Sequence, residues 1–214
     1  MATVRYETPT EVALVLDQCA SIVRGFYARG WVLGTAGNFS VLLKDEPFCL
    51  AITKSGTDKE GITRNDFIHL DRHGNVIEGF GQPSAEVAIH QELVRFESIG
   101  VVFHTHSIWA TVLSTATPTD ALFLRGYEML KGLHEIESHN TLEYLPIIEN
   151  SQDVNALSME VRELLRKKPA LHGFLIRGHG LYTWGRTVQE AKRHIEVFEF
   201  LFEVLGRSQN YRNL

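Results

Sequence analysis

The chain has 214 residues, a formal net charge of −5 at pH 7 and 44% hydrophobic residues, so we expect residues 1–214 to form a single globular domain. The acidic balance is a poor electrostatic match for a nucleic-acid partner. The sequence contains neither a signal-peptide pattern nor the roughly 18 consecutive apolar residues of a membrane-spanning helix, which predicts a cytoplasmic protein with no membrane partner.

The first predicted helix begins at a capping box. The sequence TPTE at 8–11 combines this box with proline at the first helical position. Apolar residues then recur at helical spacing as far as Phe26, and Gly30 predicts the end of the helix. Cys19 lies in this helix and Cys49 in a predicted strand, so we expect both thiols to be buried and reduced.

The remaining elements are predicted from periodicity and from turn and capping signals. Strands are expected at 38–43, 48–53, 67–70, 76–78, 99–106, 174–176 and 181–183. A short capped turn is expected at 63–66, and helices are expected from 83 to about 96, from 109 to 114, from a cap at Ser151 to a point before Pro169, and from a capping box at 187–190 to near Gly206. The stretch 117–150 has no readable pattern. Short turns between strands favour an α/β layered domain with a largely antiparallel sheet.

Three histidines are candidate metal ligands. His104 and His106 follow the apolar run 101–103, and residues two apart in a strand point to the same face, so their imidazoles can share one cation. His179 is the third candidate, because glycines on both sides let other segments approach it closely. Three histidines with an open fourth position are typical of catalytic rather than structural zinc.

Each part of this pattern also has a plain structural interpretation. His104 and His106 can be two polar residues where a strand leaves the core, and the segment around His179 can be an ordinary hairpin turn. Among the other histidines, His134 and His139 lie in the stretch without a readable pattern and stay open as candidates.

Five short motifs together resemble a known family. They are TAGN at 35–38, KSG at 54–56, PSAE at 83–86, HTH at 104–106 and GHG at 178–180. They occur in the order seen in the class II aldolase/adducin-head family, and the resemblance extends from about residue 10 to about residue 205. It implies a three-layer αβα domain, one Zn²⁺ per subunit on His104, His106 and His179, and a homotetramer with its sites between subunits.

Within this family, the segment RGYEMLKG at 125–132 resembles the signature of the dehydratases of methionine salvage. That resemblance implies a hydro-lyase that removes water from a phosphorylated methylthio-ketopentose to give a diketone. It implies Glu128 as the acid/base, and one carboxylate can perform both proton transfers if burial raises its pKa towards neutrality. Two alternatives are a sugar-phosphate aldolase or 4-epimerase of the same family, and a non-catalytic interaction module like the adducin head, which is expected to lack metal ligands.

The family's phosphate pocket corresponds to six residues of this sequence: Thr35, Gly37, Asn38, Ser55, Gly56 and Ser84. Glycine-bounded loops and helix N-termini do attract anions, although the same residue types also populate ordinary turns. Ala85 stands where aldolases of the family often carry a second serine, so one phosphate contact is missing or comes from elsewhere. Glu86 matches the aldolase acid/base and is here a second carboxylate, a substrate contact or only a first-turn glutamate.

Overall fold

A computed structural model describes residues 6–208 of the chain. The helices are α1 (Pro9–Ala28), α2 (Val87–Leu93), α3 (Ile108–Ala116), α4 (Val154–Lys167) and α5 (Val188–Ser208), with short 3-10 turns η1 (Arg64–Asp66) and η2 (Glu128–Gly132). The strands are β1 (Asn38–Lys44), β2 (Cys49–Thr53), β3 (Phe67–Leu70), β4 (Val76–Glu78), β5 (Val101–Thr105), β6 (Ala121–Leu124), β7 (Glu143–Ile148), β8 (Gly173–Ile176) and β9 (Gly180–Gly185). In this part of the chain, no helix is both long and apolar enough to cross a membrane.

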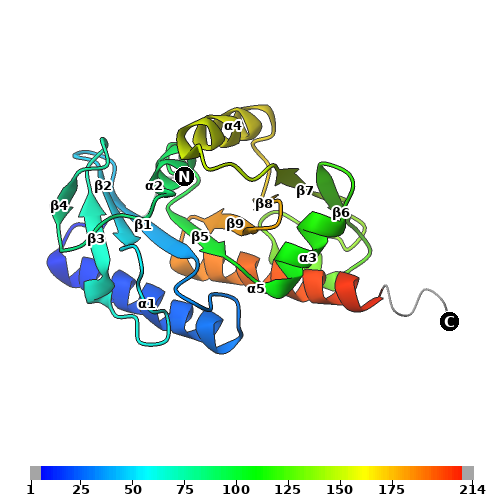
Figure 1. The fold of residues 1–214 in the computed structure, drawn as a ribbon, viewed down its shortest axis with the longest axis horizontal. Coiled ribbons are helices and arrows are strands. Elements are labelled where there is room, and N and C mark those ends of the chain that lie inside the picture. The colour runs from blue at the N-terminus through cyan, green and yellow to red at the C-terminus, as the bar shows by residue number, and fades with distance from the viewer. Residues whose placement is uncertain (1–5, 209–214) are drawn as a thin grey trace.

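The described strands form one sheet in the order β4-β3-β2-β1-β5-β9-β8-β7-β6 (Figure 1). Neighbouring strands are antiparallel except for β7 and β8, which are parallel. The predicted, largely antiparallel sheet is therefore confirmed. Strands β1, β5 and β9 lie side by side in the centre, although they are far apart in the sequence.

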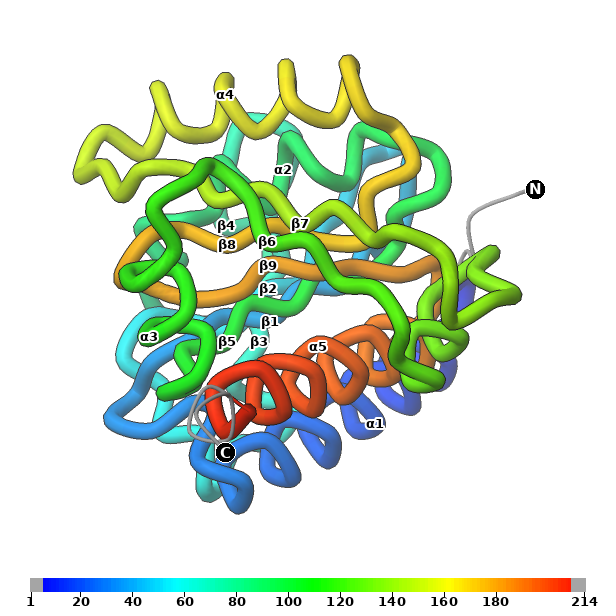
Figure 2. The backbone as a smooth tube through the Cα atoms, turned by 90° about the vertical axis from the view of Figure 1, so that its right-hand side faces the viewer, coloured from blue at the N-terminus to red at the C-terminus, as the bar shows by residue number. Residues whose placement is uncertain are grey.

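Helices cover both faces of the sheet and make three layers. In Figure 2, α2 and α4 lie above the sheet while α1 and α5 lie below it. The lower apolar core is larger and joins α1, α3 and α5 to the sheet, whereas the upper core joins α2 and α4 to it. The three-layer αβα arrangement is thus confirmed, and β1, β5 and β9 are buried almost completely between the layers.

The two long helices begin with the capping bonds that the sequence predicts. The Thr8 hydroxyl accepts from the backbone N–H of Glu11, and the Glu11 carboxylate accepts from the backbone N–H of Thr8. At the start of α5, the Thr187 hydroxyl accepts from the backbone N–H of Glu190 at 3.2 Å. These bonds satisfy N–H groups that have no partner within the first helical turn.

Three expectations are corrected by the structure. The helix expected from 83 to about 96 spans only Val87–Leu93, because Pro83 forms an isolated bridge with Lys54 instead of opening the helix. The cap of α4 is Asp153 rather than Ser151, since the Asp153 carboxylate accepts from the backbone N–H of Ala156. Both cysteines are free, as expected, but Cys49 is only partly buried.

Candidate metal centre

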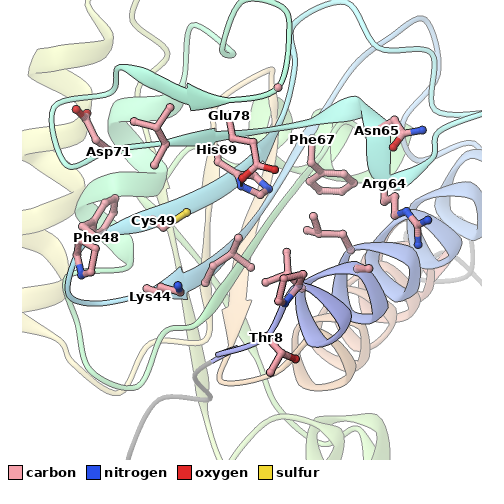
Figure 3. A pocket seen from close by; sticks show the side chains of 18 of the residues that line it. Thr8, Lys44, Phe48, Cys49, Arg64, Asn65, Phe67, His69, Asp71 and Glu78 are labelled. Atoms are coloured by element: carbon pink, nitrogen blue, oxygen red, sulfur yellow. Dashed lines mark ion pairs between the residues drawn. The ribbon is translucent and has the colours of Figure 1, made fainter.

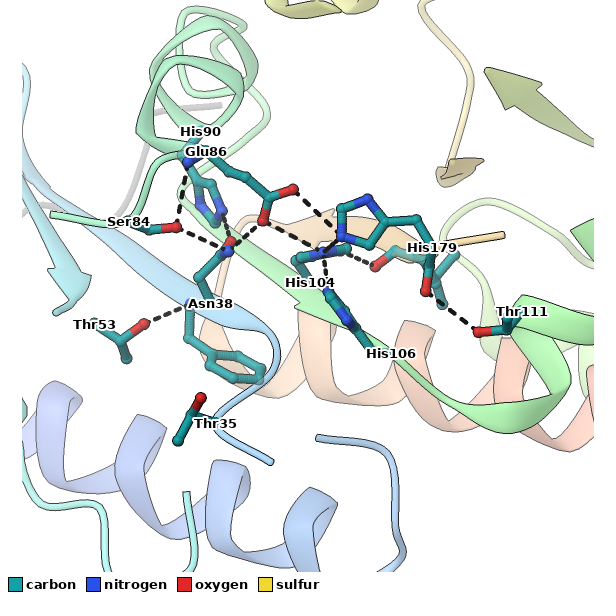
Figure 4. Close-up of polar contacts among 12 residues, drawn as sticks. Thr35, Asn38, Thr53, Ser84, Glu86, His90, His104, His106, Thr111 and His179 are labelled. Carbon is teal, nitrogen blue, oxygen red and sulfur yellow. Dashed lines mark hydrogen bonds and ion pairs between the residues drawn. The ribbon is translucent and has the colours of Figure 1, made fainter. Parts of the chain in front are cut away.

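The rings of His104, His106 and His179 converge on one point (Figure 4). His104 lies in β5, His106 directly follows that strand, and His179 lies in the turn between β8 and β9. The Nε2 atom of His104 is 2.7 Å from Nε2 of His106 and 3.4 Å from Nε2 of His179. The predicted convergence of these three histidines is therefore confirmed.

The pairing of β5 with β9 brings His179 to the other two histidines. In this antiparallel pair His104 lies opposite Tyr182 and Thr105 opposite Leu181, so the start of β9 is held against the end of β5. A Cβ atom on Gly180 would overlap the backbone carbonyl of Thr105, which explains the glycine at this position. The turn itself is fixed by Thr111, whose hydroxyl donates to the His179 carbonyl at 3.3 Å.

The environment of the rings favours neutral imidazoles. The Leu181 carbonyl, which can only accept, lies 3.0 Å from Nδ1 of His104, so this nitrogen carries the proton and Nε2 presents a lone pair to the cluster. Burial, assisted by the neighbouring His179, lowers the pKa of His104 well below its usual value. Burial likewise lowers the pKa of His106 to about 3. Neutral imidazole is the form that binds metal ions.

Glu86 adds a carboxylate to the three histidines. Its Oε2 atom is 3.5 Å from Nε2 of His104, and its Oε1 atom is 3.5 Å from Nε2 of His179. The four candidate ligand atoms all lie within 4.8 Å of one another. Glu86 is the N-cap residue of α2, but its side chain makes no capping bond. Three imidazole nitrogens and one carboxylate are a donor set that fits a divalent transition metal.

A buried chain of hydrogen bonds orients Glu86. The Asn38 amide nitrogen donates to Oε2 of Glu86 at 2.6 Å and to the Ser84 hydroxyl at 3.1 Å. On its other side, the Asn38 carbonyl oxygen contacts Nε2 of His90, and Nδ1 of His90 is 2.7 Å from the Ser40 hydroxyl. Burial lowers the pKa of His90 to about 4, so this ring links the strand and the helix as a neutral group. The Asn38 side chain thus binds Glu86 through its amide nitrogen and contacts His90 through its carbonyl oxygen.

A cavity of about 170 Å³ adjoins the histidine cluster. All six residues expected to bind phosphate line it, namely Thr35, Gly37, Asn38, Ser55, Gly56 and Ser84. Glu86 and His106 line the same cavity and connect it to the metal centre. Thr35 and Gly56 have positive φ angles of 65° and 71°, a backbone geometry found in anion-binding turns.

Two lysines of this cavity are absent from the sequence-based set. Lys54 and Lys59 both line it, and Lys59 is almost completely buried. Lys54 belongs to the KSG motif, whereas Lys59 lies in a loop with no periodic pattern. The only available signal is that Lys59 follows the motif closely, and a lysine near a turn is normally a solvated surface residue.

Glu128 has a different environment from the one expected. Glu128 begins η2, and its side chain is 70% exposed. Its Oε2 atom is 2.8 Å from Nζ of Lys131, and its Oε1 atom is 3.1 Å from Nδ1 of His139. The bond from Lys131 lowers the pKa of this carboxyl, so the condition that burial raises its pKa is not met in the single chain. The residues that line the cavity beside the histidine cluster do not include Glu128.

The histidines left open by sequence lie elsewhere. His134 is 3.1 Å from Oε1 of Glu190, and His139 pairs with Glu128. Among the described residues, the group formed by Glu86, His104, His106 and His179 is the one set of four that can hold a metal ion.

A second and larger cavity of about 1140 Å³ lies between α1 and the strands β2, β3 and β4 (Figure 3). Its walls include Phe48, Phe67 and Phe80, and on one wall His69 of β3 pairs with Glu78 of the neighbouring β4 at 3.0 Å. None of the site residues predicted from the sequence lines this cavity. Glu86, His106 and the six residues expected to bind phosphate line the smaller cavity instead.

Comparison with known proteins indicates the same family as the sequence motifs. The model of the Class II Aldolase and Adducin N-terminal domain matches residues 17–205. A methylthioribulose-1-phosphate dehydratase from Serratia proteamaculans (strain 568) is 44% identical over 176 residues, which cover 82% of this chain and 85% of that protein. The protein of the same name from Marinobacter nauticus (strain ATCC 700491 / DSM 11845 / VT8) is 39% identical over 196 residues, which cover 91% of this chain and 93% of that one.

Solved structures show the same fold. An l-fuculose-1-phosphate aldolase from Thermus thermophilus has a TM-score of 0.74 at 24% identity, covering 97% of this chain and 100% of that one. A sugar-phosphate aldolase from Thermotoga maritima has a TM-score of 0.72 at 18% identity, covering 93% and 96%. At such identities the likeness concerns the fold, and the reaction has to be argued from the site.

Proposed function

Since the chain belongs to the class II aldolase and adducin N-terminal domain family, we propose that it is a metal-dependent hydro-lyase that removes water from methylthioribulose 1-phosphate in methionine salvage. The observation that carries this proposal is the agreement of two findings. Relatives 39% and 44% identical over most of the chain bear the name of this dehydratase. The chain also retains a complete cluster of candidate metal ligands next to a cavity with anion-binding turns.

We assign one Zn²⁺ per subunit to this cluster, held by His104, His106 and His179. The fit rests on the donor set, since all three rings are close together and two of them are kept neutral by burial. When bound, such an ion acts as a Lewis acid that polarises the substrate carbonyl and makes the adjacent C–H more acidic. Glu86 is held by Asn38 and serves as a second carboxylate beside the ligands.

We assign the position of the substrate from the residues that line the cavity. Its phosphate group is assigned to the turns that contain Thr35, Gly37, Ser55 and Gly56, and its carbonyl end to the side lined by His106 and Glu86. Ser84 lines the same cavity, and its hydroxyl accepts from the Asn38 amide nitrogen. This arrangement fits a short phosphorylated ketose, whose charged group and reacting carbons then lie in one continuous space.

The proton transfers need a carboxylate, and we assign them to Glu128. It takes the proton from C3, beside the C2 carbonyl, and gives it to the departing C4 hydroxyl, so that one water leaves and an enol remains. The enol then ketonises to 5-methylthio-2,3-diketopentyl 1-phosphate. Because Glu128 is exposed on its own chain, we infer that it reaches the cavity of a second copy in a homo-oligomer, which the family resemblance gives as a tetramer.

Two other functions compete with this one. An aldolase or 4-epimerase would use the same metal centre, with Glu86 as its acid/base, and the solved aldolases share the fold. A non-catalytic module like the adducin head has no need of metal ligands, and the convergence of three histidines and Glu86 favours an enzyme instead.

Turnover of methylthioribulose 1-phosphate separates these functions. The expected product absorbs as a diketone, whereas aldol cleavage would release dihydroxyacetone phosphate or a glycolaldehyde fragment.

Removal of the metal by a chelator is expected to abolish turnover, and added Zn²⁺ to restore it. His179→Ala is expected to lower both bound metal and turnover at least 100-fold. His73→Gln, at an exposed turn, is the matched control. Bound metal without turnover of this substrate would contradict the proposal.

A further inference from the structure

Lys59 is a cation in an unusual place. Its side chain is only 1% exposed, and it is among the largest fully buried side chains of the described residues. Lysines are almost never buried to this extent without a partner, because an unpaired ammonium loses its hydration. Such a residue calls for an explanation in terms of the charge that it faces.

The described residues offer Lys59 no carboxylate at ion-pair distance. Its ammonium donates to two backbone carbonyls, those of Thr35 at 3.0 Å and Thr57 at 2.8 Å. A third N–H therefore has no partner among these residues. Lys54 shows the contrast, since it also lines this cavity but its ammonium is 2.8 Å from Oδ1 of Asp66.

The two carbonyls hold the lysine at the anion-binding end of the cavity. Thr35 has a positive φ angle and lies below Asn38 in Figure 4. Lys59 lines this cavity together with Gly37 and Ser55. The ammonium of Lys59 thus belongs to the wall of the cavity beside which the proposed function puts the phosphate group.

We propose that Lys59 binds the phosphate group of the substrate, with its free N–H and its charge directed at a phosphate oxygen. This inference rests on the proposed function, because it names a further binding residue of the same site. Burial lowers the pKa of Lys59 to about 8, so the ammonium remains largely charged at neutral pH. A phosphate dianion supplies the counter-charge that the chain does not, which selects phosphorylated over unphosphorylated ketoses.

Binding of inorganic phosphate tests this inference without any turnover. Titration calorimetry is done on the full chain with its metal and again after chelation, so that phosphate bound by the metal is recognised. Lys59→Met is expected to weaken the phosphate site that survives chelation roughly 10-fold to 100-fold, as for the loss of a charge-assisted bond. Lys54→Met, which removes a neutralised cation from the same cavity, is expected to weaken it less.

A purely structural role for Lys59 predicts other results. In that case Lys59→Met would lower the melting temperature but bind phosphate with the wild-type affinity, which would overturn the inference. If the variant does not fold, the Nζ resonance of Lys59 in ¹⁵N-lysine-labelled wild type gives the answer. Phosphate is expected to shift this resonance, and an unmoved resonance at saturating phosphate would also overturn the inference.

The inference about Lys59 and the proposed dehydration can each be refuted without refuting the other. Equal phosphate affinity of wild type and Lys59→Met leaves dehydration of the ketose untouched. Conversely, a chain that binds phosphate through Lys59 but does not dehydrate methylthioribulose 1-phosphate would refute the proposed reaction alone. In the active enzyme, Lys59→Met is expected to raise KM more than it lowers kcat, because the phosphate is remote from the carbons that react.

Discussion

Burial determines the protonation state of Glu199, which lies beneath the histidine cluster. Glu199 of α5 is 3% exposed, and its Oε1 atom accepts from the Thr105 hydroxyl at 3.3 Å. Its Oε2 atom has no hydrogen-bond partner among residues 6–208. Burial raises the pKa of Glu199 to about 7, with nearby Glu203 adding to the effect and the neighbouring hydroxyls of Ser107 and Thr105 opposing it. The folded chain thus holds a proton here that the unfolded chain releases near pH 4.5.

The pH dependence of stability follows from this difference. Between about pH 4.5 and 7 the folded state binds more protons at Glu199 than the unfolded state, so this residue reduces stability as pH rises. Over that window the loss approaches about 3 kcal/mol. Glu199→Gln removes the titration, and the free energy of unfolding of the variant minus that of wild type should increase with pH by this amount.

Urea denaturation at several pH values between 4.5 and 8 measures the effect. The subtraction cancels the other carboxylates and histidines, which are common to both proteins. Parallel stability curves for wild type and Glu199→Gln would show that Glu199 does not carry a raised pKa. Glu160→Gln, at an exposed position of α4, is the control for a change of net charge.

At the scale of elements, the seam between β5 and β9 is the feature on which the metal centre depends. A Cβ on Gly180 would overlap the Thr105 carbonyl and come within 3.1 Å of Cε1 of His104. Gly180→Ala should therefore push the two strands apart and destabilise the fold by about 2–3 kcal/mol. The same shift should weaken metal binding, because it moves His179 away from His104.

Gly25→Ala is the matched comparison for this substitution. Gly25 lies on the exposed side of α1, and a Cβ there would meet nothing within 4 Å. Because alanine favours a helix over glycine, this variant should be more stable by about 0.5–1 kcal/mol. Urea midpoints and metal stoichiometry are measured for both variants, and a Gly180→Ala variant with wild-type values would contradict the role of the seam.

Elements with local signals were predictable, and elements without them were not. The capping box at Thr8 and the GHG turn around His179 identify α1 and the β8–β9 hairpin from a few adjacent residues. By contrast, 117–150 contains two short strands and a 3-10 turn that depend on contacts with distant strands and with α5. Such contacts leave no periodic pattern in a single sequence.

The candidate site shows the same limit. The spacing of His104 and His106 predicts their shared side, the glycines that flank His179 make it the third candidate, and the motif resemblance adds the phosphate turns. The role of Asn38 in holding Glu86 depends on β1 lying beside β5 and near α2, which sequence spacing does not encode. The burial of Lys59 depends likewise on the loop at Thr35 folding over it.

At the scale of the whole molecule, the site and its proposed acid/base lie in different places on the chain. The histidine cluster lies at the centre of the sheet, whereas η2 packs against α5 and leaves the Glu128 side chain exposed. A catalytic carboxylate must reach the proton that it transfers. The two observations are reconciled if Glu128 of one copy completes the cavity of another, in which case the isolated chain is inactive.

Mixed oligomers test this arrangement directly. Glu128→Gln and His106→Ala should each be almost inactive alone, because one lacks the acid/base and the other a metal ligand. When the two are co-expressed, a site with intact histidines from one chain and an intact Glu128 from its neighbour forms in about a quarter of random pairings. Turnover should therefore recover to about a quarter of the wild-type value, measured per chain after purification of the mixture.

The size of the recovery distinguishes the possible arrangements. If Glu128 served the cavity of its own chain, every mixed site would lack either the carboxylate or the ligand, and co-expression would restore nothing. A Glu86→Gln and His106→Ala mixture is the internal control, because both residues line the same cavity of one chain and should not complement. Recovery in the Glu128 mixture together with none in the Glu86 mixture would place the first carboxylate across a subunit boundary and keep the second beside the metal ligands of its own chain.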